Sequence, residues 1–155
     1  MLFLNRQTKS LTLVENKCIH WKFILMLAMS ATVAAQGIPP KAELDAVMQN
    51  AVKQMNSQMS GLKVDEYTTL KYVSYDTTPP LFTYFYSSSA LSVTNQQSLT
   101  NAQIAAMNLF NINKTCTSNF KALMKPYSLK VAHIMEDSKT GKNFYKLTVT
   151  SFDCQ

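Results

Sequence analysis

The amino-acid sequence predicts a single-domain α+β fold, in which one antiparallel four-stranded sheet carries helices on one face. Two observations support this prediction. Apolar residues recur at helical spacing in two stretches, and residues that favour strands alternate in four others. Taken along the chain, these stretches give the order α-β-β-α-β-β. The 120 residues over positions 36–155 suit one domain with one hydrophobic core.

The first helix is predicted over residues 41–59, directly after Pro39 and Pro40. Its apolar residues are spaced by three and four positions, as on one face of an amphipathic helix. They are Leu44, Val47, Met48, Ala51, Val52, Met55 and Met59. Gly61 then provides a C-terminal stop. A methionine-rich stripe also suits an adaptable binding groove, but this spacing is more typical of a buried core.

Two strands are predicted next, over residues 66–76 and 81–88, because both are rich in Thr, Tyr, Val and Phe. The turn from Asp76 to Pro80 separates them. The second strand carries aromatic residues on both faces, with Phe82, Tyr84 and Tyr86 on one and Leu81 and Phe85 on the other. One face must pack on helices, and the other exposes aromatic rings unless another layer covers it.

A second helix is predicted from Thr100, which forms a capping box with Gln103, to about Ile112. A short helical turn follows over residues 118–124, and Pro126 ends it. Strands are then predicted over residues 127–135 and 143–151. The turn Ser138-Lys139-Thr140-Gly141 lies between them, which is the pattern of a β-hairpin.

The N-terminal region predicts export. Residues 23–35 form an apolar run that ends in Val33-Ala34-Ala35, a cleavage pattern before Gln36. The run is too short for a transmembrane helix, which needs about 20 apolar residues, so the alternatives are a short membrane anchor or a buried helix. Residues 1–22 are long for the start of a signal peptide, and a translation start assigned too far upstream explains this over-extended N-terminus. We therefore expect residues 1–35 to be a signal peptide.

After cleavage, residues 36–155 form the predicted mature domain, periplasmic or secreted, without a stable membrane anchor. Cleavage removes Cys18 and leaves Cys116 and Cys154. An exported chain with two cysteines favours a disulfide, which closes a loop worth roughly 4 kcal/mol in the chain-entropy model. The alternative is a small secreted enzyme in which His133 activates Cys116, with an acid such as Asp153. A lone histidine in a strand is more often a packed or surface residue than a base.

The charge of the predicted mature domain argues against nucleic-acid binding. Residues 1–35 hold four of the 15 basic residues and one of the 9 acidic residues, which leaves 11 lysines, no arginine, 8 acidic residues and a net charge of +3. Arginine is the usual residue for bidentate recognition of phosphate and guanine. The sequence also has no phosphate-binding glycine loop, metal-ligand spacing or Ser/His/Asp pattern, so we expect no cofactor and no metal.

The C-terminal third carries a resemblance to a known family, in residues Cys116-Thr117-Ser118, Leu123-Met124, Asp137, Gly141 and Val149-Thr150-Ser151-Phe152-Asp153-Cys154. These residues resemble the end of small exported gammaproteobacterial α+β proteins, in particular the quorum-sensing-regulated virulence factor family. The resemblance implies a periplasmic or secreted, disulfide-closed bacterial domain of poorly defined activity. No catalytic residue carries over, and Pro126-Tyr127 stands where a small residue is expected.

These observations favour a small exported binding or accessory protein of the bacterial envelope or secreted fraction, with a role in virulence as the finer expectation. A protein partner is the expected ligand. We expect its surface on the sheet face opposite the helices, bearing part of the set Tyr72, Tyr84 and Tyr86, because tyrosine offers a large contact area with a polar tip. The alternative is that these are ordinary sheet residues with their hydroxyls in water.

Overall fold

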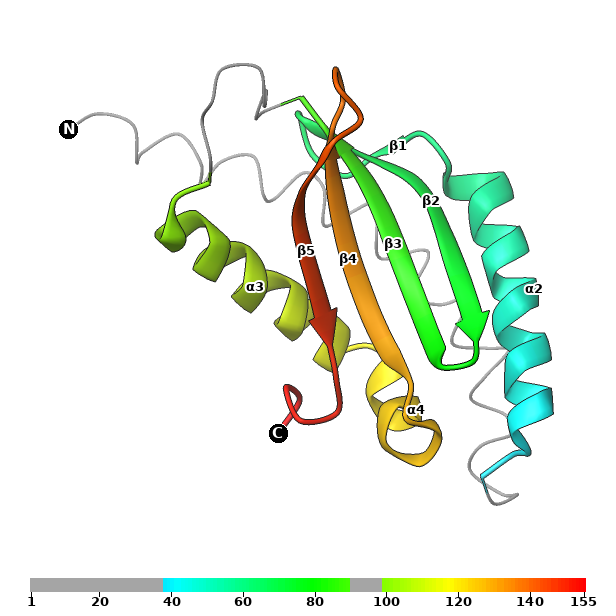
Figure 1. The fold of residues 1–155 in the computed structure, drawn as a ribbon. Helices are drawn as coiled ribbons and strands as arrows, with labels where there is room; N and C mark the ends of the chain where they lie inside the picture. The colour runs from blue at the N-terminus through cyan, green and yellow to red at the C-terminus, as the bar shows by residue number, and fades with distance from the viewer. Residues whose placement is uncertain (1–37, 90–98) are drawn as a thin grey trace. The chain divides into compact units, whose positions relative to one another are not determined.

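The computed structural model describes residues 38–89 and 99–155 (Figure 1). The predicted signal peptide, residues 1–35, lies outside the described residues. Lys41 to Gln155 form one compact unit. Its helices are α2 (Lys41–Met59), α3 (Asn101–Cys116) and α4 (Phe120–Tyr127), and its strands are β1 (Leu62–Lys63), β2 (Thr68–Thr77), β3 (Pro80–Ser88), β4 (Lys130–Asp137) and β5 (Asn143–Val149).

The strands form one mixed sheet in the order β1-β2-β3-β4-β5. The central neighbours β3 and β4 run parallel, and the other neighbours are antiparallel. The class α+β is confirmed, but the prediction of four antiparallel strands in the order α-β-β-α-β-β was wrong. The segment between β3 and β4 contains α3 and α4, which return the chain to the end of the sheet where β3 begins, and such a crossover makes neighbouring strands parallel. The short β1 adds a fifth strand.

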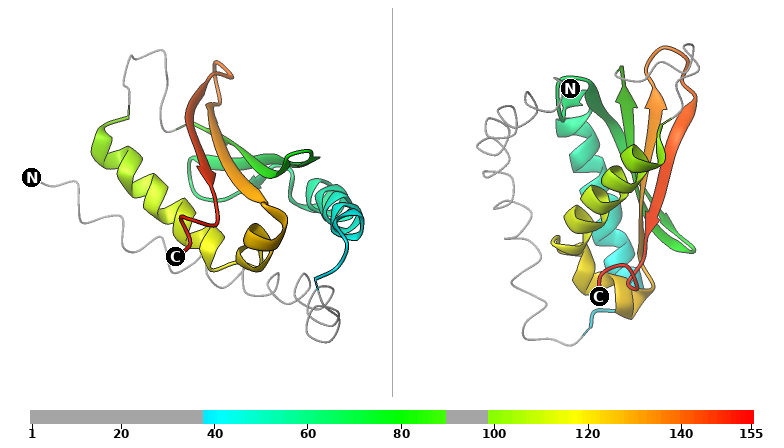
Figure 2. Two further views of the ribbon diagram at one scale, coloured as in Figure 1. Left: turned by 60° about the horizontal axis from the view of Figure 1, so that its bottom comes forward. Right: turned by 90° about the vertical axis from the view of Figure 1, so that its left-hand side faces the viewer.

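Figure 2 shows α2 and α3 on the same side of the sheet, α2 beside β2 and α3 beside β5. The helix α2 begins and ends at the predicted residues, and Gly61 follows it with a φ of 81°. The predicted capping box at Thr100 opens α3. Pro126 lies inside the last turn of α4 rather than ending it, and the helix stops at Ser128, whose φ of 53° is left-handed.

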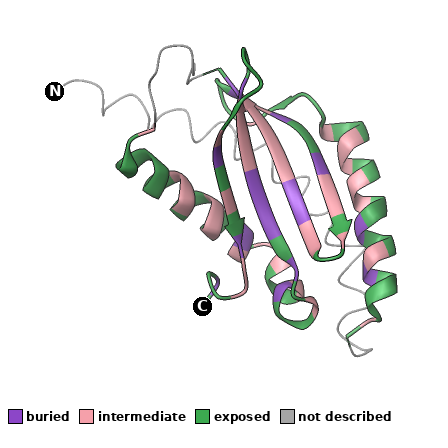
Figure 3. Cartoon of the chain, viewed as in Figure 1, coloured by how far each residue is buried: buried purple, intermediate pink, exposed green. Residues whose placement is uncertain are grey.

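The core lies between the sheet and the helices, as the buried positions in Figure 3 show. Leu44 and Met48 are the buried residues of α2, so this part of the methionine stripe is core rather than an open groove. They share the core with residues of the sheet, of α4 and of the segment that follows it: Val73, Phe82, Met124, Leu129, Val131 and Val149. Burial of these apolar surfaces stabilises the packing of the helices on one face of the sheet.

Beyond the two-residue β1, side chains of α2 and of Ser60, which follows it, bond the outer edge of β2. The Asn56 amide accepts a hydrogen bond from the Val73 N–H at 2.7 Å and donates one to the Val73 carbonyl at 2.9 Å. Ser60 donates to the Lys71 carbonyl at 2.6 Å. Unpaired backbone N–H and carbonyl groups at a sheet edge can pair with another chain. Here side-chain hydrogen bonds satisfy these groups of β2 in place of a neighbouring strand.

Candidate functional site

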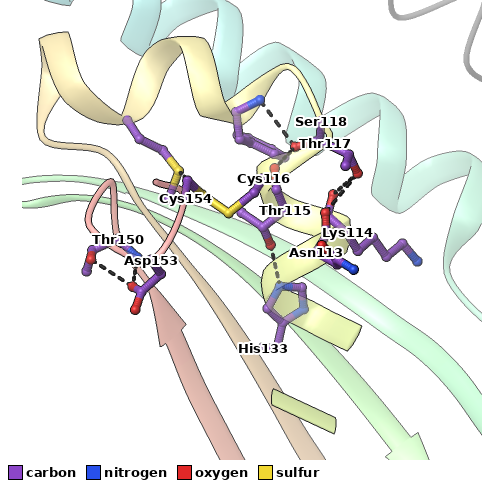
Figure 4. The surroundings of a disulfide bond; sticks show 12 residues. Asn113, Lys114, Thr115, Cys116, Thr117, Ser118, His133, Thr150, Asp153 and Cys154 are labelled. Atoms are coloured by element: carbon purple, nitrogen blue, oxygen red, sulfur yellow. Dashed lines mark hydrogen bonds between the residues drawn. A yellow bond between two sulfur atoms is a disulfide. The ribbon is translucent and has the colours of Figure 1, made fainter. Parts of the chain in front are cut away.

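The disulfide between Cys116 and Cys154 ties the end of α3 to the C-terminal turn (Figure 4). Cys154 is buried, and its sulfur lies 3.8 Å from the Met124 sulfur of α4. Asp153, next to it, accepts hydrogen bonds from the Thr150 N–H at 2.7 Å and hydroxyl at 2.8 Å, which fixes the turn after β5. The two cysteines that remain after the predicted cleavage are therefore used structurally.

His133 lies on β4 beneath α3 and is only 2% exposed. Its Nε2 is 3.0 Å from the Thr115 hydroxyl of α3 (Figure 4). Its Nδ1 is buried and has no hydrogen-bond partner among the described residues. Burial, followed by the positive charge of Lys114, lowers the pKa of His133 from 6.5 to about 4. The imidazole is therefore neutral at physiological pH.

An aromatic row surrounds this histidine on the helix side of the sheet. The rings of Tyr84 and Tyr86 lie parallel to the imidazole of His133, with centroids 5.3 and 6.3 Å away. Phe120 of α4 packs on Phe82 at 4.9 Å and meets the edge of Tyr84 at 6.4 Å. Burial raises the pKa of both tyrosines. These rings join α4 to the two central strands, so the row packs the helix layer on the sheet.

Tyr72 lies apart from this row. It stacks on Phe85 with ring centroids 4.3 Å apart, and 42% of it is exposed. Phe85 neighbours Tyr84 and Tyr86 in β3, so its side chain points to the other face of the sheet. Of the predicted tyrosine set, the structure thus brings Tyr84 and Tyr86 together on the helix side and places Tyr72 on the opposite face.

The structure does not assemble the alternative Cys/His/Asp site. The Cys116 sulfur is bonded to Cys154, His133 contacts Thr115, and the Asp153 carboxylate accepts from Thr150. A nucleophilic cysteine needs a thiolate with its base in hydrogen-bond reach. Among the described residues no group of three His, Cys, Asp or Glu side chains could hold a metal ion. In residues 38–89 and 99–155 no helix has both the length and the apolar character to cross a membrane.

Sequence reasoning missed Thr115, the helix residue that contacts His133. Nothing local relates Thr115 to a histidine 18 residues further along the chain. One signal was present in the strand: alternation places His133 on the same face as the buried Val131, which predicts that it packs inward.

No protein-family model matches the chain, and a search of curated proteins finds no match. Two solved structures share the fold. One is a candidate secreted protein from Pseudomonas aeruginosa, with a TM-score of 0.58 and 11% identity over 77% of this chain and 100% of that chain. The other is a pilotin of the type 2 secretion system of Vibrio vulnificus, with a TM-score of 0.54 and 12% identity over 74% of this chain and 94% of that chain. At these identities, both likenesses show a shared fold.

Proposed function

We propose that this chain is an exported, non-enzymatic accessory protein of the bacterial envelope that binds a protein partner. The observation that carries the proposal is the use of Cys116 in the disulfide, which removes the nucleophile of the alternative enzymatic site. The fold shared with a candidate secreted protein and a pilotin supports an envelope setting and a protein partner. A virulence role rests on the family resemblance of the C-terminal residues.

The surface that we assign to the partner is the sheet face on the side away from α2 and α3. Tyr72 and Phe85 form its stacked aromatic pair, and the ion pair between Lys71 and Glu136, at 2.7 Å, lies beside them. An aromatic pair of exposed Tyr72 and half-buried Phe85, with a charged border, has the composition of an interface centre and its rim. Tyr84 and Tyr86 contribute only indirectly, because they hold α4 on the other side of the sheet.

Two matched substitutions test this assignment. Tyr72→Ser removes an exposed ring, so we expect the folding midpoint in denaturant to change little while partner binding is lost. Tyr84→Ser removes a ring packed on His133 and Phe120, so we expect a loss of about 2–4 kcal/mol in the free energy of unfolding. The measurements are denaturant unfolding and a photo-crosslink from position 72 in intact cells.

The crosslinking experiment needs its own control. The same photoreactive residue at Lys53, which is exposed on α2, reports nonspecific contacts. A discrete adduct from position 72 that is absent from position 53, and that disappears in Phe85→Ser, supports the assigned surface. The same adducts from both positions, or a sharp loss of stability in Tyr72→Ser, contradict it.

A further inference from the structure

The outer edge of β5 presents backbone groups that no described residue uses. Asp137, the last residue of β4, donates its N–H to the carbonyl of Lys142 in the turn before β5, whereas the next residue, Ser138, donates its N–H to the carbonyl of Ser88 in β3. The backbone groups of successive residues along β4 therefore face β5 and β3 in turn. The odd-numbered residues of β4 pair with Tyr145, Leu147 and Val149. The N–H and carbonyl groups of Lys146 and Thr148 therefore point away from the sheet, and no hydrogen bond links them to another described residue.

The helix α3 crosses the sheet obliquely and continues past this edge. Thr115, in its last turn, contacts His133 of β4. About one turn and a half earlier, Asn111 and Asn108 bond the Tyr145 hydroxyl of β5 at 3.1 and 3.0 Å. Between these two sets of contacts, the helix axis passes from above β4 to above β5, a distance of one strand spacing, about 4.8 Å. The same slope carries its first two turns over the position that a sixth strand would occupy, and Figure 1 shows this end of α3 lying outside β5.

The residues around that position indicate which side chains an added strand would need. Ile104, in the second turn of α3, lies on the helix side that carries Asn108 and Asn111, and it is 36% exposed. Lys146 is the one charged residue of β5, and α3 contributes only Lys114, so these two elements contain no carboxylate. Side chains of an added strand would alternate between the underside of α3 and the face of Lys146.

We propose that β5 accepts an extended segment of a partner protein as a sixth strand beneath the first two turns of α3. Backbone hydrogen bonds to Lys146 and Thr148 would hold the segment, and this is the mode of recognition known as strand addition. The fitting segment has an apolar side chain towards Ile104 and an acidic side chain beside Lys146. This edge is distinct from the Tyr72 surface, so either proposal can fail without the other.

A second copy of this chain fits the edge poorly. Antiparallel pairing of two β5 strands about a twofold axis perpendicular to the sheet keeps both α3 helices on the same side. Each helix projects over the partner's strand, so the two would compete for the same space. Pairing centred on Lys146 would also place two lysines directly opposite each other, which is destabilising.

The free protein gives the first test, by NMR amide exchange on the protein as it is purified from the expressing cell. We expect the amides of Lys146 and Thr148 to exchange at least about tenfold faster than those of Tyr145 and Leu147, whose hydrogen bonds to β4 protect them. Equal protection of all four amides would show that the edge is already occupied and would overturn the proposal.

Binding is then measured with peptides selected from a displayed library of eight-residue sequences. We expect the selected peptides to alternate apolar and acidic residues, and their binding to protect the amides of Lys146 and Thr148. Thr148→Pro removes an outward N–H from an edge position that tolerates proline, and should weaken binding about tenfold. Thr148→Ala keeps that N–H and should bind within about twofold of the parent. Lys146→Gln should weaken only the peptides that carry an acidic residue.

A peptide series covers the case in which Thr148→Pro does not fold. N-methylation of alternate peptide amides should abolish binding in one alternating set and spare the other, because a docked strand uses every second N–H for the sheet. Binding that is equal in both sets, that survives Thr148→Pro in a folded variant, or that leaves both edge amides unprotected would refute strand addition at β5. A selection that yields no peptide dependent on these amides would refute it as well.

Discussion

Acidification from pH 7 to pH 5 should destabilise this protein through His133. Burial lowers the folded-state pKa of His133 from 6.5 to about 4, so the folded state binds fewer protons than the unfolded state between these values. Stability is therefore retained above pH 6.5 and lost as the pH falls towards 4. With these two pKa values, the linkage relation gives a loss of about 2 kcal/mol between pH 7 and pH 5, or roughly twentyfold in the folding equilibrium.

The assay is urea unfolding at pH 7 and pH 5, with His133→Phe as the comparison. Phenylalanine keeps a ring beside Tyr84 and Tyr86 but cannot take up a proton, so the stability of this variant should change by less than about 0.5 kcal/mol over this interval. Comparing each protein with itself cancels the cost of losing the contact with Thr115. An NMR titration should place the folded imidazole near pH 4. An equal loss of stability in both proteins, or an imidazole that titrates near 6.5, would refute the reasoning.

Three further predictions concern the disulfide, processing and the closed edge of the sheet. Without reduction, alkylation should add no mass at Cys116 or Cys154, and replacing both with Ser should cost about 4 kcal/mol in unfolding experiments; two modified thiols in the native protein would contradict this. Peptide mapping of protein from the envelope or medium should find a new N-terminus after Ala35, whereas an intact Met1 peptide in that pool would disprove cleavage. Asn56→Leu leaves the N–H and carbonyl of Val73 unsatisfied, so it should lower the free energy of unfolding by about 1–3 kcal/mol. It should also promote concentration-dependent association, measured by sedimentation. A variant as stable and monomeric as the parent would show that this contact is dispensable.

The sequence predicted those parts of the fold that local patterns encode. The spacing of Leu44 and Met48 within the apolar stripe was enough to predict α2, and the turn around Gly141 was enough to predict the hairpin of β4 and β5. The direction of β4 relative to β3 depends on the connection between them, and a rule was available: a helical crossover between adjacent strands favours parallel pairing. The two-residue β1 had no such signal, because Leu62 and Lys63 pair with β2 through the turn that follows them, where Asp65 accepts hydrogen bonds from the N–H groups of Tyr67 and Thr68.

For the candidate site, the sequence predicted the sheet face of single residues but not how these residues come together. Alternation correctly separated Tyr84 and Tyr86 from Phe85, but the position of Tyr72 depends on an irregularity in register between Leu70 and Tyr72. A bulge of this kind shifts which face the following side chains occupy, and periodicity alone does not reveal it. The burial of His133 likewise depends on α3 crossing above β4, which is a tertiary contact.

The outer sides of β2 and β5 differ in how their backbone groups are used. At β2, polar side chains of α2 take the place of a neighbouring strand, and Asn56 alone satisfies both backbone groups of Val73. At β5, α3 lies above the edge, and no hydrogen bond links the outward backbone groups of Lys146 and Thr148 to another described residue. The polar residues nearest the centre, His133 and Thr115, are committed to holding α3 in place. The aromatic area around Tyr72 and the backbone groups of β5 are therefore the two surfaces on which our proposals of partner binding rest.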